Sequence, residues 1–428
     1  MSLLSSSATA PASTSPLLVA AASATHDSMN RKWILKRHPI GLFDPALDVE
    51  LVPDTDHGNN EKKGDKTLDK EKDVDELKDT EIVVQPQLLS VDAFLRTMCD
   101  EHAYHGSIQL GQTFPALGYG KVLKVGAKST HKVGSCVVGM LAAADTITLD
   151  GTQAMPSMKF PFLSRSSSLG LMGLTAGLTA YCGVFYVPSR IPHKGETVVV
   201  TGAAGSVGSI AVQLCQSTGA RVIGVAGGVR KTQYLINQLH CDGAIDYKNT
   251  STQGMTLEEQ ITKACPNGID FIYDNVGGRI LDALLYHINP KGRVVICGAI
   301  SQYSGNLNKE KKCESTESSH SDDTDDDNNN KQGRSRRSEE GGGKQCMVMG
   351  PSNYLKLAER GAEMKGFNVM QYMSKLPFMV IGMYYLYLRG YVTVEEHIED
   401  GLDKFPLALQ KLFTGETIGK TLVRINPE

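Results

Sequence analysis

A glycine-rich turn between an apolar strand and a helix constrains this chain more than any other stretch. Residues 197–217 read TVVVTGAAGSVGSIAVQLCQS. Gly205 and Gly208 hold the second and third glycine places of a G-x-G-x-x-G pattern, and Ala203 holds the first. Gly205 lets the backbone approach a pyrophosphate, Gly208 allows close helix packing, and a helix starting near Ser206 directs free N–H groups at the phosphates. Because the turn follows a strand and opens a strand–helix repeat, it predicts a dinucleotide site.

The segments after this turn alternate between apolar strands and amphipathic helices. Four further strands are expected from ARVIGVAG, DGAIDY, IDFIYDNVGG and GRVVICGAIS, each ending in glycine or a polar residue. Continuous apolar strands belong to a parallel sheet covered on both faces. We therefore predict an α/β fold in which residues 166–390 form a Rossmann-type, doubly wound parallel sheet.

The first part of the chain has a different pattern of predicted secondary structure. Between residues 29 and 165, short β-rich runs such as KWILKR and EIVVQPQLLSV alternate with glycines and polar turns, as in an irregular barrel or a partly open sheet. The closing stretch GLDKFPLALQKLFTGETIGKTLVRI predicts a helix and then a strand. We assign residues 29–165 and 391–428 to one β-rich domain.

Three segments contain too little apolar surface to offset the entropy of ordering. Residues 1–28 form a tail without lysine or arginine, which lacks the basic residues of a secretory or mitochondrial leader. Residues 55–80 and 308–345 are charged and polar, without hydrophobic periodicity. We expect a disordered tail and two disordered inserts, the second interrupting one domain because strand and helix continue beyond it.

The bulk composition narrows the class of protein. The chain has 428 residues, a formal net charge of -3 and 9 cysteines, with no C-x-x-C pair. These values favour a reducing, cytoplasmic location and give no global field for nucleic acid or a membrane, so we expect neither as a partner. The apolar run LPFMVIGMYYLYL (376–388) is too short to span a bilayer. We interpret it as a buried helix, with a subunit interface as an alternative.

The end of the strand after the glycine turn indicates which dinucleotide binds. NAD sites usually place Asp or Glu there to accept hydrogen bonds from the adenosine ribose. Here the strand runs into Gly227 and Gly228, and Arg230 and Lys231 follow. Because cations attract a 2′-phosphate, the sequence predicts NADPH. The alternative is that both cations are ordinary solvated helix residues.

Several motifs together resemble a known family. GLTAGLTAYCGV, TGAAGSVGS, GAIDYKN, IDFIYDNVGGRILD and VVICGAISQYSGN are similar to the zinc-free medium-chain reductases of the prostaglandin reductase, leukotriene B4 12-hydroxydehydrogenase and 2-alkenal double-bond reductase group. The resemblance is dense over 170–306 and resumes in GPSNYLKLAERGAEMKGFNVMQY and FPLALQKLFTGETIGKTLV. It implies a GroES-like β-rich domain, NADPH as cofactor, a homodimer, and reduction of an enone or enal.

The resemblance also implies site residues. It places the pyrophosphate at Gly205, Ser206, Val207 and Gly208. The 2′-phosphate and adenosine end would lie at Lys231 and Tyr247, next to the Arg230 that the cation argument adds. The nicotinamide side would be formed by Asn275, Cys297, Gly298, Ala299, Ile300, Ser301, Gln302 and Tyr303, with further contacts from Phe367, Asn368, Val369 and Thr417. Two residues depart from the family pattern: Thr417 stands where Asn is common, and Phe94 where Tyr is common.

Tyr303 is the candidate catalytic residue. Hydride addition to the β-carbon of an unsaturated carbonyl places negative charge on the carbonyl oxygen, and a hydrogen-bond donor held there stabilises the transition state by about 3 kcal/mol. Tyr303 follows a strand at the carboxyl edge of the expected sheet, where ligands of such sheets bind. The alternative is a tyrosine that only packs on the nicotinamide.

Three other functions stay open at this point. A zinc alcohol dehydrogenase would need Cys and His ligands, and Cys99, His102 and His105 are the only tempting cluster. We expect no metal, because no four-cysteine segment accompanies them. A quinone reductase of the same superfamily and a nonenzymatic NADPH-binding interaction protein are the remaining alternatives.

Overall fold

The computed structural model describes residues 30–54, 77–101, 103, 106–248, 254–304 and 350–426. The expected tail lies outside these residues, as do nearly all of the first expected insert and the whole of the second. Of the first insert, residues 77–80 are described, and they lead directly into strand β3 (Glu81–Ser90).

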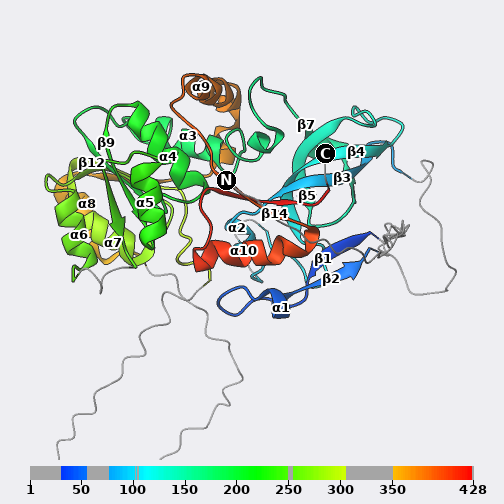
Figure 1. The fold of residues 1–428 in the computed structure, drawn as a ribbon, viewed down its shortest axis with the longest axis horizontal. Coiled ribbons are helices and arrows are strands. Elements are labelled where there is room, and N and C mark those ends of the chain that lie inside the picture. Colours follow the sequence, from blue (N-terminus) through cyan, green and yellow to red (C-terminus); the bar gives the residue numbers. More distant parts are fainter. Residues whose placement is uncertain are drawn as a thin grey trace, which may run out of the picture.

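A six-stranded parallel sheet forms one half of the molecule (Figure 1). Its strand order is β10-β9-β8-β11-β12-β13, which confirms the predicted Rossmann-type fold. The strands are β8 (Thr197–Thr201), β9 (Arg221–Ala226), β10 (Gly243–Asp246), β11 (Ile269–Asp274), β12 (Ile288–Ile296) and β13 (Glu363–Gly366).

Helices cover both faces of this sheet because alternate residues of each strand face opposite ways. On β8, Val198 and Val200 join one core, whereas Val199 joins the other. The first core includes α3 (Gly177–Phe185), α4 (Ser206–Ser217), α5 (Val229–Asn237) and α9 (Leu376–Leu388). The second includes α6 (Leu257–Ala264) and α7 (Gly278–Tyr286), with α8 (Leu355–Arg360) packed against it.

A β-rich half contains a seven-stranded sheet and a two-stranded sheet. The larger sheet has the order β14-β15-β3-β4-β5-β7, with β6 paired to β3. Its other strands are β4 (Pro115–Val125), β5 (Cys136–Ala142), β6 (Ile147–Asp150), β7 (Ala154–Pro156), β14 (Glu396–Asp400) and β15 (Lys420–Arg424). The smaller pairs β1 (Arg31–Leu35) with β2 (Val49–Pro53) on either side of α1 (Pro45–Asp48). Helices α2 (Phe94–Met98) and α10 (Phe405–Thr414) complete this half.

The C-terminal segment joins the two halves. Strand β15 inserts between β14 and β3, so the last described strand is internal to the larger sheet of the β-rich half. Just before it, Gly419 forms a parallel bridge with Gly205 at the start of α4, and its N–H donates to the Ala204 carbonyl at 2.9 Å. The glycine turn of one half is thereby bonded to the other half.

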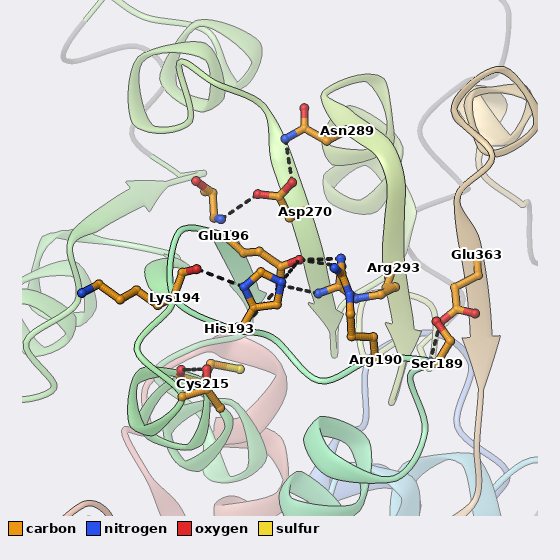
Figure 2. A network of polar contacts seen from close by, with 12 residues as sticks. Ser189, Arg190, His193, Lys194, Glu196, Cys215, Asp270, Asn289, Arg293 and Glu363 are labelled. Carbon is orange, nitrogen blue, oxygen red and sulfur yellow. Dashed lines mark hydrogen bonds and ion pairs between the residues drawn. The ribbon is translucent and has the colours of Figure 1, made fainter.

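The amino ends of the parallel strands are fixed by a buried ion pair (Figure 2). Arg293 on β12 donates to both carboxylate oxygens of Glu196, at 3.0 and 2.6 Å, and neither side chain is more than 8% exposed. Arg190 donates to the same carboxylate at 2.7 Å. The edge of the sheet opposite the glycine turn is therefore held by charge.

Helix α9 corrects one expectation. It spans the predicted residues, but only Met379 and Met383 are buried, whereas Phe378 and Ile381 are 64% and 66% exposed. An apolar sequence indicates that a helix can be covered on every side, but only the neighbouring elements decide which sides are covered. Among the described residues, no helix has the length and apolar character to cross a membrane.

Candidate functional site

The glycine turn lies at the carboxyl end of β8 and opens α4. Gly205 is the N-cap of α4, and no side chain caps the helix there, so its first N–H groups are available to an anion. A Cβ on Gly208 would clash with the Gly202 carbonyl oxygen, which explains why this helix position requires glycine. A Cβ on Gly205 would lie 3.2 Å from that oxygen and could be accommodated by a small shift. The fold alone therefore does not demand glycine at position 205, unlike at position 208.

Ser206 gives an independent test of whether a phosphate fits. Its Oγ is buried and has no hydrogen-bond partner among the described residues. A buried hydroxyl without a partner costs about 1–3 kcal/mol, which a phosphate oxygen at the helix start would remove. Val207, the next residue, turns away and packs on the first core. The residues of this turn thus fit the pyrophosphate of a dinucleotide.

A cationic cavity of 440 Å³ lies beside the ends of β9 and α10. Arg230, Lys231 and Lys411 line it together with Gly227 and Gly415. The Lys231 ammonium is half-buried, and its pKa is lowered, first by burial and then by the nearby charges of Lys248 and Arg230. Glu416 also lines the cavity and Lys411 is paired with Glu399, but neither Arg230 nor Lys231 makes an ion pair among the described residues, so these two cations fit a phosphate dianion.

Lys248 is a residue that sequence reasoning missed at this end of the site. It lies two residues after β10, and its Nζ donates to the Thr414 carbonyl at 3.4 Å, close to Lys231. The parallel register Ala226↔Asp246 places the ends of β9 and β10 side by side, so the motif DYKN carried the necessary signal. Tyr247, which was predicted, packs against Gly227.

Asp246 is a carboxylate that the sequence argument did not weigh. It comes from the neighbouring strand, and its Oδ1 accepts from the N–H groups of Gly228 at 2.7 Å and Lys248 at 3.0 Å. It does not line the cationic cavity. Its role in the folded chain is to fix the turn that precedes α5.

The predicted nicotinamide side is a tight loop after β12. Cys297 and Gly298 donate to the Asp274 carbonyl at 2.8 and 3.2 Å, and Ile300 donates to the Asn275 carbonyl at 3.2 Å. Asn275 in turn donates through its side chain to the Thr201 carbonyl, at 2.7 Å. The ends of β8, β11 and β12 therefore meet at one point of the sheet edge.

The remaining loop residues fold back on the turn after β11. The Ser301 hydroxyl and N–H both donate to the Val276 carbonyl, at 2.6 and 3.2 Å, and the Gln302 N–H donates to Ala299 at 2.8 Å. Ala299 lies against Gly277, where φ is +70° and an L side chain would be strained. The loop is therefore held by backbone carbonyls, both its own and that of Val276 in the turn after β11.

Asp274 is the second residue that sequence reasoning missed. It is fully buried at the end of β11, where its carboxylate accepts from the Thr201 hydroxyl at 2.6 Å and the Gly277 N–H at 2.9 Å. Burial raises the pKa of this carboxyl to about 6, although these hydrogen bonds and one from Val276 oppose the shift. Asp274 thus positions the turn against which the Tyr303 loop packs.

Tyr303 folds over the start of its own loop. Its hydroxyl oxygen accepts from the Ala299 N–H at 3.2 Å and lies next to Gly298. Burial raises the pKa of the phenol above its ordinary value, so the hydroxyl stays protonated at neutral pH. The phenol hydrogen has no acceptor among the described residues and is free to donate to a ligand.

The other predicted residues gather at the same edge. Phe367 follows β13, whose last residue, Gly366, pairs with Ile296, so Phe367 and Cys297 leave adjacent strands. The Asn368 side chain accepts from the Met370 N–H at 2.9 Å, and Val369 packs on the first core. Thr417 is buried between α10 and β15, two residues before the glycine that bridges to the cofactor turn. Phe94, the second departure, opens α2 and packs on the β-rich core.

The described residues give no support to the alternative zinc site at Cys99, His102 and His105. Cys99 is buried, its Sγ donates to the Leu95 carbonyl at 3.4 Å, and burial raises the pKa of its thiol to about 12. His102 and His105 lie outside the described residues. Within the part of the chain that the structure describes, no three His, Cys, Asp or Glu side chains come together as metal ligands.

Comparisons with known proteins show which family this chain resembles. A family model described as an N-terminal domain of oxidoreductase matches residues 31–157, and one described as zinc-binding dehydrogenase matches residues 206–312. The 2-alkenal reductase (NADP(+)-dependent) of Nicotiana tabacum is 30% identical over 81% of this chain and 88% of its own length. Prostaglandin reductase 1 of Rattus norvegicus is 28% identical over 81% of this chain and 90% of its own.

A solved structure shares the whole fold. CurA from Vibrio vulnificus superposes with a TM-score of 0.71 at 26% identity, over 93% of this chain and 99% of that one, and CurA has also been solved in complex with NADPH. The predicted resemblance is thereby confirmed. The chain belongs to the medium-chain dehydrogenase/reductase family, in the group of NADP-dependent oxidoreductases that contains the alkenal and prostaglandin reductases.

Proposed function

We propose that this chain reduces the α,β carbon–carbon double bond of enones and enals with NADPH. The names of its relatives support this reaction class. The observation in this chain that carries the proposal is the Tyr303 hydroxyl, whose oxygen is held by the Ala299 N–H while its hydrogen stays available at the sheet edge.

The cofactor would be held along the carboxyl edge of the parallel sheet. The start of α4 with Ser206 would bind the pyrophosphate, and Lys231 with Arg230 and Lys248 would bind the 2′-phosphate. Asn275 and the loop 297–303 would flank the nicotinamide. Bound NADPH supplies the hydride.

Tyr303 would act on the substrate oxygen. As hydride adds to the β-carbon, charge moves to the carbonyl oxygen, and a phenol donor fixed at that oxygen stabilises the charge as it develops. The Ala299 N–H fixes the phenol and polarises it further, because a hydroxyl that accepts a hydrogen bond becomes a better donor. Phe94 cannot substitute for this hydroxyl, since it has none.

The direct test is turnover by the purified chain with a panel of enones, enals, quinones and saturated alcohols. We expect NADPH oxidation with the unsaturated carbonyls and a product saturated at the α,β bond. Tyr303→Phe should lower kcat by roughly 10²- to 10³-fold while the Kd for NADPH changes little. Tyr286→Phe, on an exposed tyrosine of α7, is the matched control.

Three results would contradict the proposal. Reduction of quinones alone would favour the quinone reductase alternative, and NADPH binding without any turnover would favour a nonenzymatic role. If Tyr303→Phe turned over as fast as the parent enzyme, the tyrosine would only pack in the site and would take no part in the chemistry. The homodimer, the cytoplasmic location and the division into residues 29–165 with 391–428 and residues 166–390 stay predictions of the sequence.

A further inference from the structure

One side of α9 is apolar and uncovered in the folded chain. Phe378, Ile381, Tyr385 and Leu388 are 52–66% exposed, and their spacing of three, four and three residues places them in one stripe. The opposite side packs so closely on α3 that a Cβ on Gly382 would clash with the Tyr181 hydroxyl. The helix, which lies at the outer edge of the molecule in Figure 1, therefore leaves its apolar stripe exposed to solvent.

A strained and exposed phenylalanine lies in a loop that is bonded to α9. Phe162 is 85% exposed and has a φ of +66°, a backbone region that bulky L residues rarely adopt. Its loop is fastened to α9, because the Tyr387 hydroxyl donates to the Phe162 carbonyl at 2.6 Å and the Tyr384 hydroxyl donates to Pro161 at 3.1 Å. We name Phe162, Phe378, Ile381, Tyr385 and Leu388 together the α9 face.

The charged residues in the two chain segments that form the α9 face are all positive. Residues 157–165 and 369–391 contain Lys159, Arg165, Lys375 and Arg389 but no Asp or Glu, in a chain whose net charge is -3. The ammonium groups of Lys159 and Lys375 have no ion-pair partner among the described residues. The sequence argument against a membrane partner considered the net charge of the whole chain. It did not consider the local excess of positive charge in these two segments.

We propose that the α9 face docks on the surface of a bilayer that contains anionic lipids, with α9 lying in the plane of the interface. Apolar side chains enter the boundary between headgroups and acyl chains, and the surrounding cations meet anionic headgroups. Tyrosines are suited to this depth because one end of the ring is apolar and the other is polar. A helix of 13 residues extends only about 20 Å, so it lies on the bilayer and does not span it.

The charge pattern argues against a second copy of the chain as the occupant. A two-fold contact would place the same face on both sides, which would bring Lys159, Lys375 and Arg389 of one copy against those of the other. Acidic residues that could compensate are absent from both segments. Like charges across an interface oppose association, whereas an anionic surface complements them. The proposal does not depend on the proposed function, because binding to vesicles needs neither NADPH nor a substrate.

The test is flotation of the full-length protein with phosphatidylcholine vesicles, with or without 30 mol% phosphatidylserine. We expect binding to the phosphatidylserine vesicles, weakened by 0.5 M NaCl, and much less binding to pure phosphatidylcholine. The double variant Phe378→Gln/Ile381→Gln and the double variant Lys159→Gln/Lys375→Gln should each lower the partition coefficient by roughly tenfold or more. The matched controls are Leu355→Gln, on an exposed residue of α8, and Lys263→Gln, on α6.

Circular dichroism and turnover of a water-soluble substrate should be unchanged in both double variants, so that lost flotation reports the surface and not the fold. Absence of binding to either vesicle, or binding that the α9 variants leave intact, would overturn the proposal. So would a dimer in sedimentation that dissociates in Phe378→Gln/Ile381→Gln, because the α9 face would then be a contact between copies.

Discussion

At the scale of single residues, the chemistry of this chain depends on groups whose usual partner is missing. Among the described residues, the buried Ser206 hydroxyl has no hydrogen-bond partner, the Tyr303 phenol hydrogen has no acceptor, and the Lys231 ammonium has no ion-pair partner. Each of these costs stability in the ligand-free chain. Their concentration along one edge of one sheet is what marks that edge as a binding site.

Lys231→Ala tests the cofactor end of this site. If the ammonium meets the 2′-phosphate, its removal should weaken NADPH binding by about 10- to 100-fold, since hydrogen bonds to charged groups contribute about 1.5–3 kcal/mol. NADH lacks that phosphate, so its Kd should change little. Fluorescence titration with both cofactors measures the difference, with Lys263→Ala as control. Equal losses of affinity for NADPH and NADH would show that Lys231 does not contact the 2′-phosphate.

Substitutions of the two glycines in the turn before α4 should have different effects, one on stability and one on cofactor binding. Gly208→Ala forces a Cβ against the Gly202 carbonyl and should lower the free energy of unfolding by about 1–3 kcal/mol. Gly205→Ala meets the same oxygen at 3.2 Å, so the fold should tolerate it, but the methyl group would occupy the approach of the pyrophosphate. Chemical denaturation and NADPH titration of both variants separate the two effects. The reverse pattern would contradict these assignments.

At the scale of secondary-structure elements, the two ends of the parallel sheet serve different purposes. The carboxyl ends hold glycines, amides and unpaired donors, whereas the amino ends are fixed by Glu196 and Arg293. Burial by itself would raise the pKa of Glu196, but the hydrogen bonds and the charge of Arg293, with that of Arg190, outweigh it and lower the pKa. The carboxylate therefore stabilises the fold when it is ionised.

Glu196→Gln should destabilise the chain by about 3–5 kcal/mol, because it leaves the buried Arg293 charge uncompensated. The pH dependence has a definite sign. Stability from a carboxyl with a lowered folded-state pKa is present above its unfolded pKa of about 4.3 and is lost as the pH falls through the folded value. The difference between parent and variant should thus shrink below about pH 4. Denaturant melts from pH 3 to 7 measure it, and Glu359→Gln in an exposed pair should cost under about 0.5 kcal/mol.

Local patterns predicted most of this architecture. The turn at Gly205, the parallel strands and the limits of α9 follow from short stretches of sequence. Lys248 and Asp274 were missed because their roles depend on which strands lie side by side. The exposure of Phe378 was missed for a related reason, since α9 has an apolar sequence all round and only the position of α3 determines which side is covered.

At the scale of the whole molecule, the two halves are bonded at the glycine turn and along α4, where we propose that the cofactor binds. The bridge between Gly205 and Gly419 and the hydrogen bonds between Gln213 and Thr393, at 2.9 Å, cross from α4 to the returning segment. A ligand that orders the start of α4 therefore also acts on β15, which is internal to the other sheet.

NADPH should accordingly raise the melting temperature of the whole chain. We expect one calorimetric transition that shifts upward as a unit, with about 2.7 kcal/mol of added stability at 100 times the Kd. Lys231→Ala should show a smaller shift at the same NADPH concentration. Two separate transitions, of which NADPH moves only one, would show that the halves unfold independently.

The placement of β15 also sets an order of events during synthesis. The parallel sheet is built from residues 197–366, so all of its strands leave the ribosome before β15 does. The larger sheet of the β-rich half cannot be completed at that stage, because Leu422 and Val423, wholly buried and paired with β3, follow later in the chain. Until β15 has been added, residues 88–90 of β3 have one unpaired edge, and a nascent chain of this protein is exposed to chaperones and to aggregation through that edge.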